Sequence, residues 1–407
     1  MDARIRPIHE EETDEFVYIN AYGFDRDRSP EALAEAAALE RRLYPPESKF
    51  AAFLDGRMVA RMHLFPAGVY LNGGVVPMGA IGGIAVLPEH RRRGLTAALL
   101  LHALNEMRGR GQAVSALYPM HYDLYRRYGW EVVSDSVRYS FPPRRTRVAR
   151  CAAGSCRRAA ADEWPALDAV YARYAARHNG CLTREEPWWR ETVLGGGHEA
   201  RDLALWEIDG AVTGYVVYRS RHFPVPERYQ PMSVLQVREL VALDGDSYAG
   251  LLGFVLHHDL HDRVDWPSSR QEPLPYVIDD ASKVKVENGW PQTALRLVDV
   301  RRALEARPCL PIAEGCRLTI GVRDAAAGWN EGAWRLEAFE GRARVEPTAA
   351  EPDLTVEVGA LAAVYAGRLP VGEAARAGLI EVRDERALDV ASNFFAVSSP
   401  FHCLDWF

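Results

Sequence analysis

The chain has 407 residues, of which 48% are hydrophobic and 26% charged, and its formal net charge at neutral pH is −7. This length predicts two or three domains, and the composition is that of an ordinary globular protein. The acidic balance disfavours nucleic acid as the main partner, and no run of about 18 uninterrupted apolar residues predicts a membrane span. The N-terminal residues lack the apolar core of a signal peptide, so we expect a cytoplasmic protein.

The first part of the chain, residues 1–146, predicts a mixed α/β domain. Ser29-Pro30 has the pattern of a helix N-cap followed by a proline at the first helical position. Asp55-Gly56 and Asn72-Gly73 are turn dipeptides that join two pairs of strands. The expected strands cover residues 3–7, 49–54, 58–70, 75–86, 113–117 and 132–140, and the expected helices cover 11–22, 29–42, 95–107 and 121–128.

Residues 83–95 join a strand to a helix through a basic turn, and this is the most informative segment of the chain. An apolar, β-branched stretch ends at Pro88, the arginines Arg91, Arg92 and Arg93 follow, and Gly94 precedes a helix that begins at Leu95. The free N–H groups and dipole of a helix N-terminus favour an anion such as a pyrophosphate. The alternative is that the arginines are merely solvated before an ordinary helix and bind no ligand. The preceding strand, the proline break and the long helix favour the anion site.

Two common phosphate-binding motifs are absent, because the sequence contains neither G-x-x-x-x-G-K-[ST] nor a G-x-G-x-x-G that opens a helix after a first strand. The remaining pattern, R-R-x-G-x followed by small residues, resembles the acyl-CoA pyrophosphate loop of the GCN5-related N-acetyltransferases (GNAT).

Residues 147–304 predict a second unit with the same strand, turn and helix order. A strand over 234–243 leads through Asp244-Gly245-Asp246 to a helix over 248–260. Two carboxylates at this turn would repel a pyrophosphate, so we interpret the unit as a degenerate copy that does not bind coenzyme A (CoA). A metal site on Asp244 and Asp246 is the alternative, but further ligands are missing.

Residues 305–407 predict a third, α+β unit, because strands come first and helices follow. The expected strands cover 317–322, 334–339, 343–347 and 354–358, and the expected helices 359–367, 372–377 and 385–395. The six cysteines of the whole chain lack zinc-type spacing, so we expect free or buried thiols and no metal. They are Cys151, Cys156, Cys181, Cys309, Cys316 and Cys403.

The chain ends in a segment dense in large apolar groups, residues 399–407. Such a tail should dock against the protein, since an exposed aromatic side chain forfeits roughly 1.5–3 kcal/mol. Docking would desolvate the α-carboxylate of Phe407, raise its pKa and make it a better base. The alternative is that the tail only packs the third unit against a neighbour.

Transfer of an acyl group to an amine also needs a carbonyl polariser and a proton donor for the departing thiolate. Backbone N–H groups of Ile84, Ala85 and Val86 can polarise the carbonyl if a bulge leaves them free. A tyrosine of the segment 118–130 suits the acid role, because its reference pKa of about 10 lies above that of a thiol, about 8.5. Each of these tyrosines could instead be a half-buried core residue, and His121 is a competing acid or base that could likewise be packed in the core.

With these residues placed, the chain resembles the Eis (enhanced intracellular survival) family of bacterial acetyltransferases over nearly its whole length. The resemblance lies in residues 85–88 with 90–95, in Leu124-Tyr125-x-Arg127-Tyr128-Gly129, in residues 295–300 with Ala303-Leu304, and in the aromatic C-terminus. It implies tandem GNAT domains, the first catalytic (1–146) and the second degenerate (147–304), followed by a domain like sterol carrier protein (305–407).

The resemblance also implies roles for particular residues. Tyr125 would be the general acid, and the Phe407 carboxylate the general base. Acetyl-CoA would be bound by the strand, the basic loop and the first turn of the helix, with two further residues beside its pantetheine arm. These residues are Ile84, Ala85, Val86, Arg91, Arg92, Arg93, Gly94, Leu95, Thr96, Ala97, Met120 and His121.

Members of the Eis family acetylate amines of aminoglycosides, some acetylate lysine side chains, and hexamers are usual. Asp25 and Asp405 are candidate partners of a polycationic substrate by opposite charge, although both could be merely solvated carboxylates. Trp130 and the bulky pair His121-Tyr122 could narrow the acceptor pocket. No cysteine nucleophile is placed near Tyr125, which favours direct transfer.

The sequence is also compatible with two functions other than acetyl transfer. A lipid-binding or apolar-ligand-binding protein would need a large apolar cavity in the third unit. An acyltransferase that uses a longer acyl chain could be built on the same duplicated GNAT scaffold.

Overall fold

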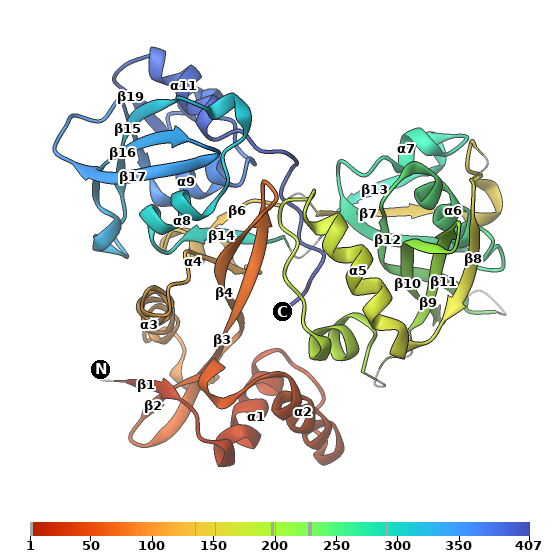
Figure 1. Ribbon diagram of the computed structural model, residues 1–407. Helices are drawn as coiled ribbons and strands as arrows, with labels where there is room; N and C mark the ends of the chain where they lie inside the picture. The colour runs from red at the N-terminus through yellow and green to blue at the C-terminus, as the bar shows by residue number, and fades with distance from the viewer. Residues whose placement is uncertain are drawn as a thin grey trace. The chain divides into compact units, whose positions relative to one another are not determined.

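The computed structural model describes residues 3–134, 136–150, 152–196, 199, 201–226, 230–289 and 292–407 (Figure 1). The chain forms two compact units. The first comprises Met1–Val133, Thr293–Phe401 and Phe407, and the second comprises Ser134–Gln292 and His402–Trp406.

The first unit contains a seven-stranded sheet with the order β1-β2-β3-β4-β5-β14-β6. Its strands are β1 (Arg4–Pro7), β2 (Lys49–Leu54), β3 (Arg57–Leu71), β4 (Gly74–Val86), β5 (Val114–Leu117), β14 (Ala294–Leu297) and β6 (Glu131–Val132). Its helices are α1 (Thr13–Gly23), α2 (Pro30–Leu43), α3 (Leu95–Gly109) and α4 (Tyr122–Arg126). A buried apolar core lies between this sheet and α3.

Local sequence chemistry explains the turns of this sheet. Asp55 and Gly56 both have positive φ angles, as do Asn72 and Gly73, which is the geometry of a tight hairpin turn. Ser29 caps α2, because its side chain accepts a hydrogen bond from the Ala32 N–H at 3.3 Å. These predicted turns and this predicted cap are confirmed.

The strand expected over residues 132–140 is wrong, because the chain divides there. Residues 131–132 form β6 of the first sheet, while β7 (Ser136–Phe141) pairs with strands of the second unit. In exchange, β14 enters the first sheet between β5 and β6. The sheets therefore do not follow the contiguous boundaries at residues 146 and 304 that the sequence suggested.

The first unit also contains a five-stranded sheet with the order β17-β16-β15-β18-β19. Its strands are β15 (Arg317–Arg323), β16 (Gly332–Phe339), β17 (Arg342–Thr348), β18 (Leu354–Glu357) and β19 (Ile380–Val382). The helices of this part are α8 (Val300–Ala306), α9 (Val358–Tyr365), α10 (Val371–Arg376) and α11 (Arg386–Phe394). All four predicted strands and all three predicted helices after residue 310 are present, and the short β19 was not predicted.

The second unit is built on a sheet with the order β13-β7-β12-β11-β10-β9-β8. Its further strands are β8 (Ser155–Ala159), β9 (Asp202–Ile208), β10 (Ala211–Phe223), β11 (Met232–Ala242), β12 (Arg263–Ser269) and β13 (Lys285–Asn288). Its helices are α5 (Trp164–Ala175), α6 (Gly245–Leu256) and α7 (Leu274–Val277), and residues Trp188–Val193 form a π-helical turn. The sequence did not predict β8, β12 and β13.

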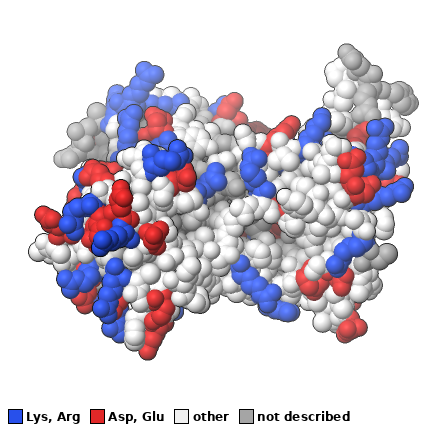
Figure 2. All heavy atoms as spheres, turned by 90° about the horizontal axis from the view of Figure 1, so that it is seen from above, with Lys and Arg blue, Asp and Glu red and all other residues white. Residues whose placement is uncertain are grey.

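Basic and acidic side chains lie close to one another in several groups on the face shown in Figure 2. The described part of the chain contains many ion pairs, for example those of Arg157 with Glu163 and with Glu207, each at 2.8 Å. None of the described helices is long and apolar enough to cross a membrane. The described residues also contain no group of three or more His, Cys, Asp or Glu that could hold a metal ion.

Candidate active site

The centre of the candidate site is a bulge in β4. The pairing with β3 shifts between Arg61, which is opposite Ala85, and His63, which is opposite Gly82. Gly83 and Ile84 therefore share one position of the partner strand, and Gly83 has a φ of +54°. A bulge disrupts the hydrogen-bond ladder locally and turns backbone groups away from it. This is the condition under which the N–H groups of Ile84, Ala85 and Val86 can polarise a carbonyl.

Strand β4 also separates from its other neighbour at this point. Its parallel pairing with β5 runs from Met78 opposite Val114 to Ile81 opposite Leu117, while β4 itself continues to Val86. Within the described chain, the stretch after Ile81 has no ladder partner in β5. The strands therefore leave an unpaired backbone edge next to the bulge, where an extended ligand can form strand-like hydrogen bonds.

The N-terminus of α3 follows this edge and is suited to an anionic ligand. Gly94 is the N-cap with a φ of +77°, no side chain caps the helix, and its first turn carries no acidic residue. Arg91, Arg92 and Arg93 are exposed in the loop before it, and the Arg91 Nε donates to the Val86 carbonyl at 3.1 Å. A side chain added at Gly94 would meet no atom of the described chain within 4 Å apart from its chain neighbours, so a diphosphate can approach the backbone on this side.

The corresponding helix of the second unit, α6, has its N-terminus occupied by the protein itself. The Asp244 side chain accepts a hydrogen bond from the Ser247 N–H at 2.8 Å, and Asp246 is ion-paired with Arg150. These two carboxylates supply the negative charge that a diphosphate would bring. Asp244 and Asp246 are thus held by protein partners, in agreement with a copy that does not bind CoA.

Tyr125 lies in α4 and is buried, with 8% of its surface exposed. It belongs to the same apolar core as Ile81, Leu95 and Leu117, which places it beside β4, β5 and the start of α3. Burial raises the pKa of Tyr125 to about 12. No described residue hydrogen-bonds its hydroxyl, so this O–H can donate to a ligand.

The last residue of the chain packs against the strands on both sides of β4. The Phe407 ring lies 5.6 Å from that of Phe65 in β3 and 5.0 Å from that of Tyr118, which directly follows β5. Its carboxyl carbon would lie 3.1 Å from a methyl group placed on Gly82. A side chain at this position of β4 would crowd the terminal carboxyl group, which therefore lies immediately before the bulge.

The remaining predicted ligands of the site lie on the first turn of α3 and before α4. Thr96 and Ala97 are half-buried, whereas Met120 is 51% exposed and His121 is an exposed N-cap of α4. Asp25 is exposed in the turn after α1, with a φ of +51°. The preceding Gly23 packs closely on Ala85 of β4, so this turn borders the bulged strand.

Asp405 differs from the prediction. Its side chain is fully buried in the second unit and forms an ion pair with Arg184 at 2.9 Å. A carboxylate that is already neutralised and shielded from solvent is poorly suited to recognise a substrate amine. We therefore do not include Asp405 among the residues that bind the acceptor.

A buried polar cluster on β3 was not predicted from the sequence. Arg61 Nη2 lies 2.7 Å from His63 Nδ1, and the other ring nitrogen of His63 contacts the Glu40 carboxylate of α2. Burial, aided by the charge of Arg61, lowers the pKa of His63 to about 4. The cluster borders the site, since His63 is opposite Gly82 and Arg61 reaches the bulge at Gly83. Two polar residues two positions apart in an apolar strand were the available signal.

The part of the chain after residue 310 encloses little empty space at its apolar centre. A cavity lined by Ile320, Leu354, Leu361 and Phe395, among others, has a volume of about 10 Å³. This is about the space that one water molecule needs and is far too small for an acyl chain. It gives no support to the lipid-binding alternative.

A bulged strand, a strand edge that opens beside it and a basic loop on an uncapped helix together define a GNAT N-acetyltransferase. The family comparisons agree: residues 4–133 and residues 180–297 each match an acetyltransferase (GNAT) domain, and residues 300–403 match a sterol carrier protein domain. The chain belongs to the Eis family of GNAT N-acetyltransferases, as the individual relatives show.

Three relatives illustrate this membership. An uncharacterized N-acetyltransferase of Streptomyces coelicolor is 30% identical over 78% of this chain and 77% of its own length. The N-acetyltransferase Eis of Mycobacterium tuberculosis is 25% identical over 80% of each chain. The crystal structure of Eis1 from Mycobacterium abscessus superposes with a TM-score of 0.82 at 26% identity, covering 99% of this chain and 100% of the other. The protein is therefore an N-acetyltransferase, and GNAT acetyltransferases use acetyl-CoA.

Proposed function

We propose that this protein transfers the acetyl group of acetyl-CoA directly to an amine of a cationic small molecule, an aminoglycoside being the first candidate, and that lysine side chains are a second acceptor class. The observation that carries the proposal is the position of the Phe407 carboxylate against Gly82, immediately before the β4 bulge. A terminal carboxylate in this place is suited to accept a proton from an attacking amine.

Different residues of the site would bind acetyl-CoA and polarise its carbonyl group. Arg91, Arg92 and Arg93, with the free N–H groups of α3, would hold the diphosphate, while Met120 and His121 would flank the pantetheine arm. When bound, acetyl-CoA supplies an activated thioester. The N–H groups of Ile84, Ala85 and Val86 would polarise its carbonyl and stabilise the negative charge that develops on the oxygen.

Proton transfer would require one base and one acid. The Phe407 carboxylate would take the ammonium proton of the acceptor, directly or through a water molecule, so that a neutral amine attacks. Tyr125 would donate its hydroxyl proton to the departing sulfur. Its raised pKa, about 12, keeps the hydroxyl protonated at neutral pH, which an acid requires.

Recognition of the acceptor is supported by charge. Asp25 is exposed in the turn that borders β4, and the chain as a whole carries a formal charge of −7. Both favour a polycationic acceptor, with the local carboxylate setting orientation and the net charge assisting association.

The test is the release of free CoA thiol with a panel of aminoglycosides, polyamines and lysine peptides, using the wild type and Tyr125→Phe. Turnover with an aminoglycoside that falls by roughly 10²-fold or more in the variant is the expected result. No turnover with any amine, despite saturable binding of CoA, would overturn the acceptor class. Faster turnover with longer acyl-CoA donors would contradict acetyl transfer.

The family resemblance supports a homo-hexamer in addition. Light scattering coupled to size exclusion should then give the mass of six 45.5 kDa chains. A mass of one or two chains would contradict it.

A further inference from the structure

The C-terminal tail is divided between the two units. Residues His402–Trp406 belong to the second unit, and Phe407 belongs to the first. The carboxylate proposed as the base is thus only two residues away from Asp405, a buried member of the second unit. Two residues of extended chain span about 7 Å, so the position of Asp405 constrains that of the terminal carboxylate closely.

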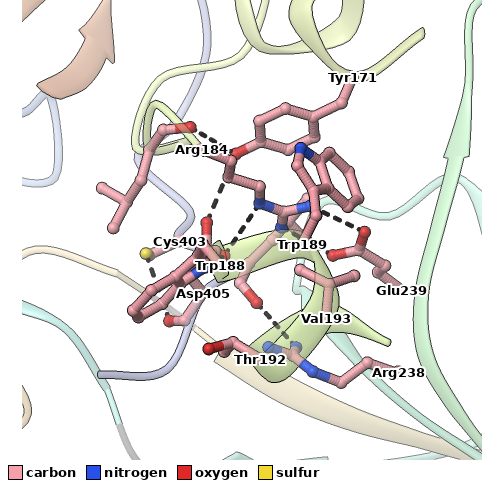
Figure 3. Close-up of polar contacts among 12 residues, drawn as sticks. Tyr171, Arg184, Trp188, Trp189, Thr192, Val193, Arg238, Glu239, Cys403 and Asp405 are labelled. Carbon is pink, nitrogen blue, oxygen red and sulfur yellow. Dashed lines mark hydrogen bonds and ion pairs between the residues drawn. The ribbon is translucent and has the colours of Figure 1, made fainter. Parts of the chain in front are cut away.

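Asp405 is held by a buried polar network centred on Arg184 (Figure 3). Arg184 Nε donates to Asp405 Oδ1 at 2.9 Å, and its two terminal nitrogens donate to the Glu239 carboxylate at 2.9 and 2.8 Å. The Trp188 indole N–H donates to the same Asp405 oxygen at 2.8 Å. All three charged side chains are completely buried. A guanidinium that binds two carboxylates through the N–H donors in its plane fixes both in orientation as well as in distance.

The backbone of the tail is held in the same region. The His402 N–H donates to the Asn179 carbonyl at 2.9 Å, and the Leu404 carbonyl accepts from Arg238 at 2.8 Å. Gly180 permits this approach, because a side chain there would lie 2.7 Å from the His402 carbonyl oxygen. The tail is therefore fixed by its main chain at residues 402 and 404 and by its side chain at residue 405.

Simple docking of an apolar tail would not need this arrangement. Burying an arginine and two carboxylates carries a large desolvation cost, which an apolar contact of the same size would avoid. What the network adds is direction, because charge-assisted hydrogen bonds tolerate small errors of position poorly. Displacement of a reacting group by about 1 Å can cost roughly 10²-fold in rate.

We propose that Arg184, Trp188 and Arg238 of the degenerate GNAT-like unit are positioning residues for catalysis. They hold the tail at Leu404 and Asp405 so that the Phe407 carboxylate reaches its place before the β4 bulge. This inference rests on the proposed function of that carboxylate as the base. It gives the second unit a part in the reaction although it does not bind CoA.

The sequence offers a matched pair of tryptophans for the test. Trp188 donates its indole N–H to Asp405 of the tail, whereas the adjacent Trp189 donates to Asp168 of α5 at 2.8 Å. A phenylalanine at either position keeps an aromatic ring and removes the donor. Trp188→Phe should lower kcat by about 10-fold and leave the KM for acetyl-CoA within about twofold, because the α3 loop is unchanged. Trp189→Phe should keep the wild-type kcat per molecule of CoA-binding enzyme.

A second readout follows the tail itself, without any turnover. Carboxypeptidase A releases C-terminal aromatic residues only from a chain end that is free to enter its active site. Release of Phe407 should be several-fold faster in Trp188→Phe and in Asp405→Asn than in Trp189→Phe. Near-ultraviolet circular dichroism on each variant shows whether the fold is kept, and rates are compared only per folded molecule.

Deletion of Phe407 separates the two proposals. If this deletion retains the wild-type kcat, the base is not the terminal carboxylate, and the proposed function and the positioning role both fail. If the deletion is inactive while Trp188→Phe matches Trp189→Phe in kcat and in carboxypeptidase release, the positioning role alone is overturned.

Discussion

Helices α3 and α6 hold equivalent places in the two GNAT-like sheets, yet their N-termini have opposite chemistry. At α3, a glycine with open space around it precedes the helix, and three exposed arginines stand in the loop. At α6, Asp244 caps the first turn and Asp246 is ion-paired with Arg150. A duplicated fold can thus keep its helix while its own carboxylates supply the negative charge at the helix N-terminus. The second unit still binds the C-terminal tail, through the hydrogen bonds of Arg184, Trp188 and Arg238.

Of the variants that test this difference between the two units, we expect deletion of the last residue of the chain to lower kcat the most. Deletion of Phe407 leaves both helices untouched and moves the terminal carboxylate back by one residue, about 3.5 Å. We expect kcat to fall by roughly 10²- to 10⁴-fold, the usual contribution of a general base. Steady-state kinetics measure this, and calorimetry should show that affinity for CoA is kept. Parallel losses of CoA affinity and kcat would instead indicate damage to the first sheet.

Acid should lower the stability of both units through one histidine in each, of which His63 is buried and His402 is half-buried. Burial lowers the pKa of His63 in the first unit and of His402 in the second, to about 4 in both cases. In the unfolded chain these histidines bind a proton near pH 6.5, whereas in the folded protein they stay neutral until about pH 4. The free energy of unfolding is therefore unaffected by them above pH 6.5 and decreases as the pH falls from 6.5 towards 4. For His63 the loss is roughly 3 kcal/mol in the free energy of unfolding.

Urea unfolding at pH 7, 5.5 and 4.5 measures this dependence. Glutamine at position 63 can still donate to Glu40 but does not titrate, so His63→Gln should flatten the curve. His402→Gln should do the same for the second unit. The ion pair of Arg184 and Glu239 should persist over this range. Burial alone would raise the pKa of Glu239, but the charge of Arg184 holds it below the usual value.

The substitution Gly94→Asp places an aspartate at the N-cap of α3, the residue type that α6 has at its N-cap. The repulsion between this carboxylate and a diphosphate should raise the KM for acetyl-CoA by roughly 10- to 100-fold, with a smaller effect on kcat. Gly94→Asn is the control, since it has the same shape and the same left-handed backbone but no charge. Equal effects of the two variants would attribute the loss to the backbone rather than to electrostatics.

Removal of the N-cap carboxylate of α6 in the second unit should have the smallest effect. Asp244→Ala removes the N-cap of α6 and should lower the free energy of unfolding by about 1 kcal/mol. The acetylation rate should not change, because the α6 terminus takes no part in the reaction. Thermal unfolding and the thiol-release assay measure the two quantities. A loss of kcat in the folded variant would indicate that the second helix contributes more than packing.

Much of the site could be predicted because it depends on residues near one another in sequence. The basic loop and the glycine before α3 are contiguous, and their chemistry needs only a strand before them and a helix after them. The turn dipeptides at residues 55–56 and 72–73, the cap at Ser29 and the acidic turn before α6 are local in the same sense. The predicted docking of the tail is confirmed for Phe401, Cys403 and Leu404, which are buried, whereas Trp406 is 49% exposed.

The tertiary structure alone decided which distant residues meet. The exchange that places β14 between β5 and β6 joins segments about 180 residues apart, and neither hydrophobic period nor turn chemistry specifies a partner at that distance. Asp405 appeared to be a substrate ligand because its charge is visible in the sequence, whereas its partner Arg184 is 221 residues away. The sequence by itself determined local backbone conformation and the charge carried by each loop. The burial of those charges, and therefore their pKa values and roles, depended on contacts that form only when the chain is folded.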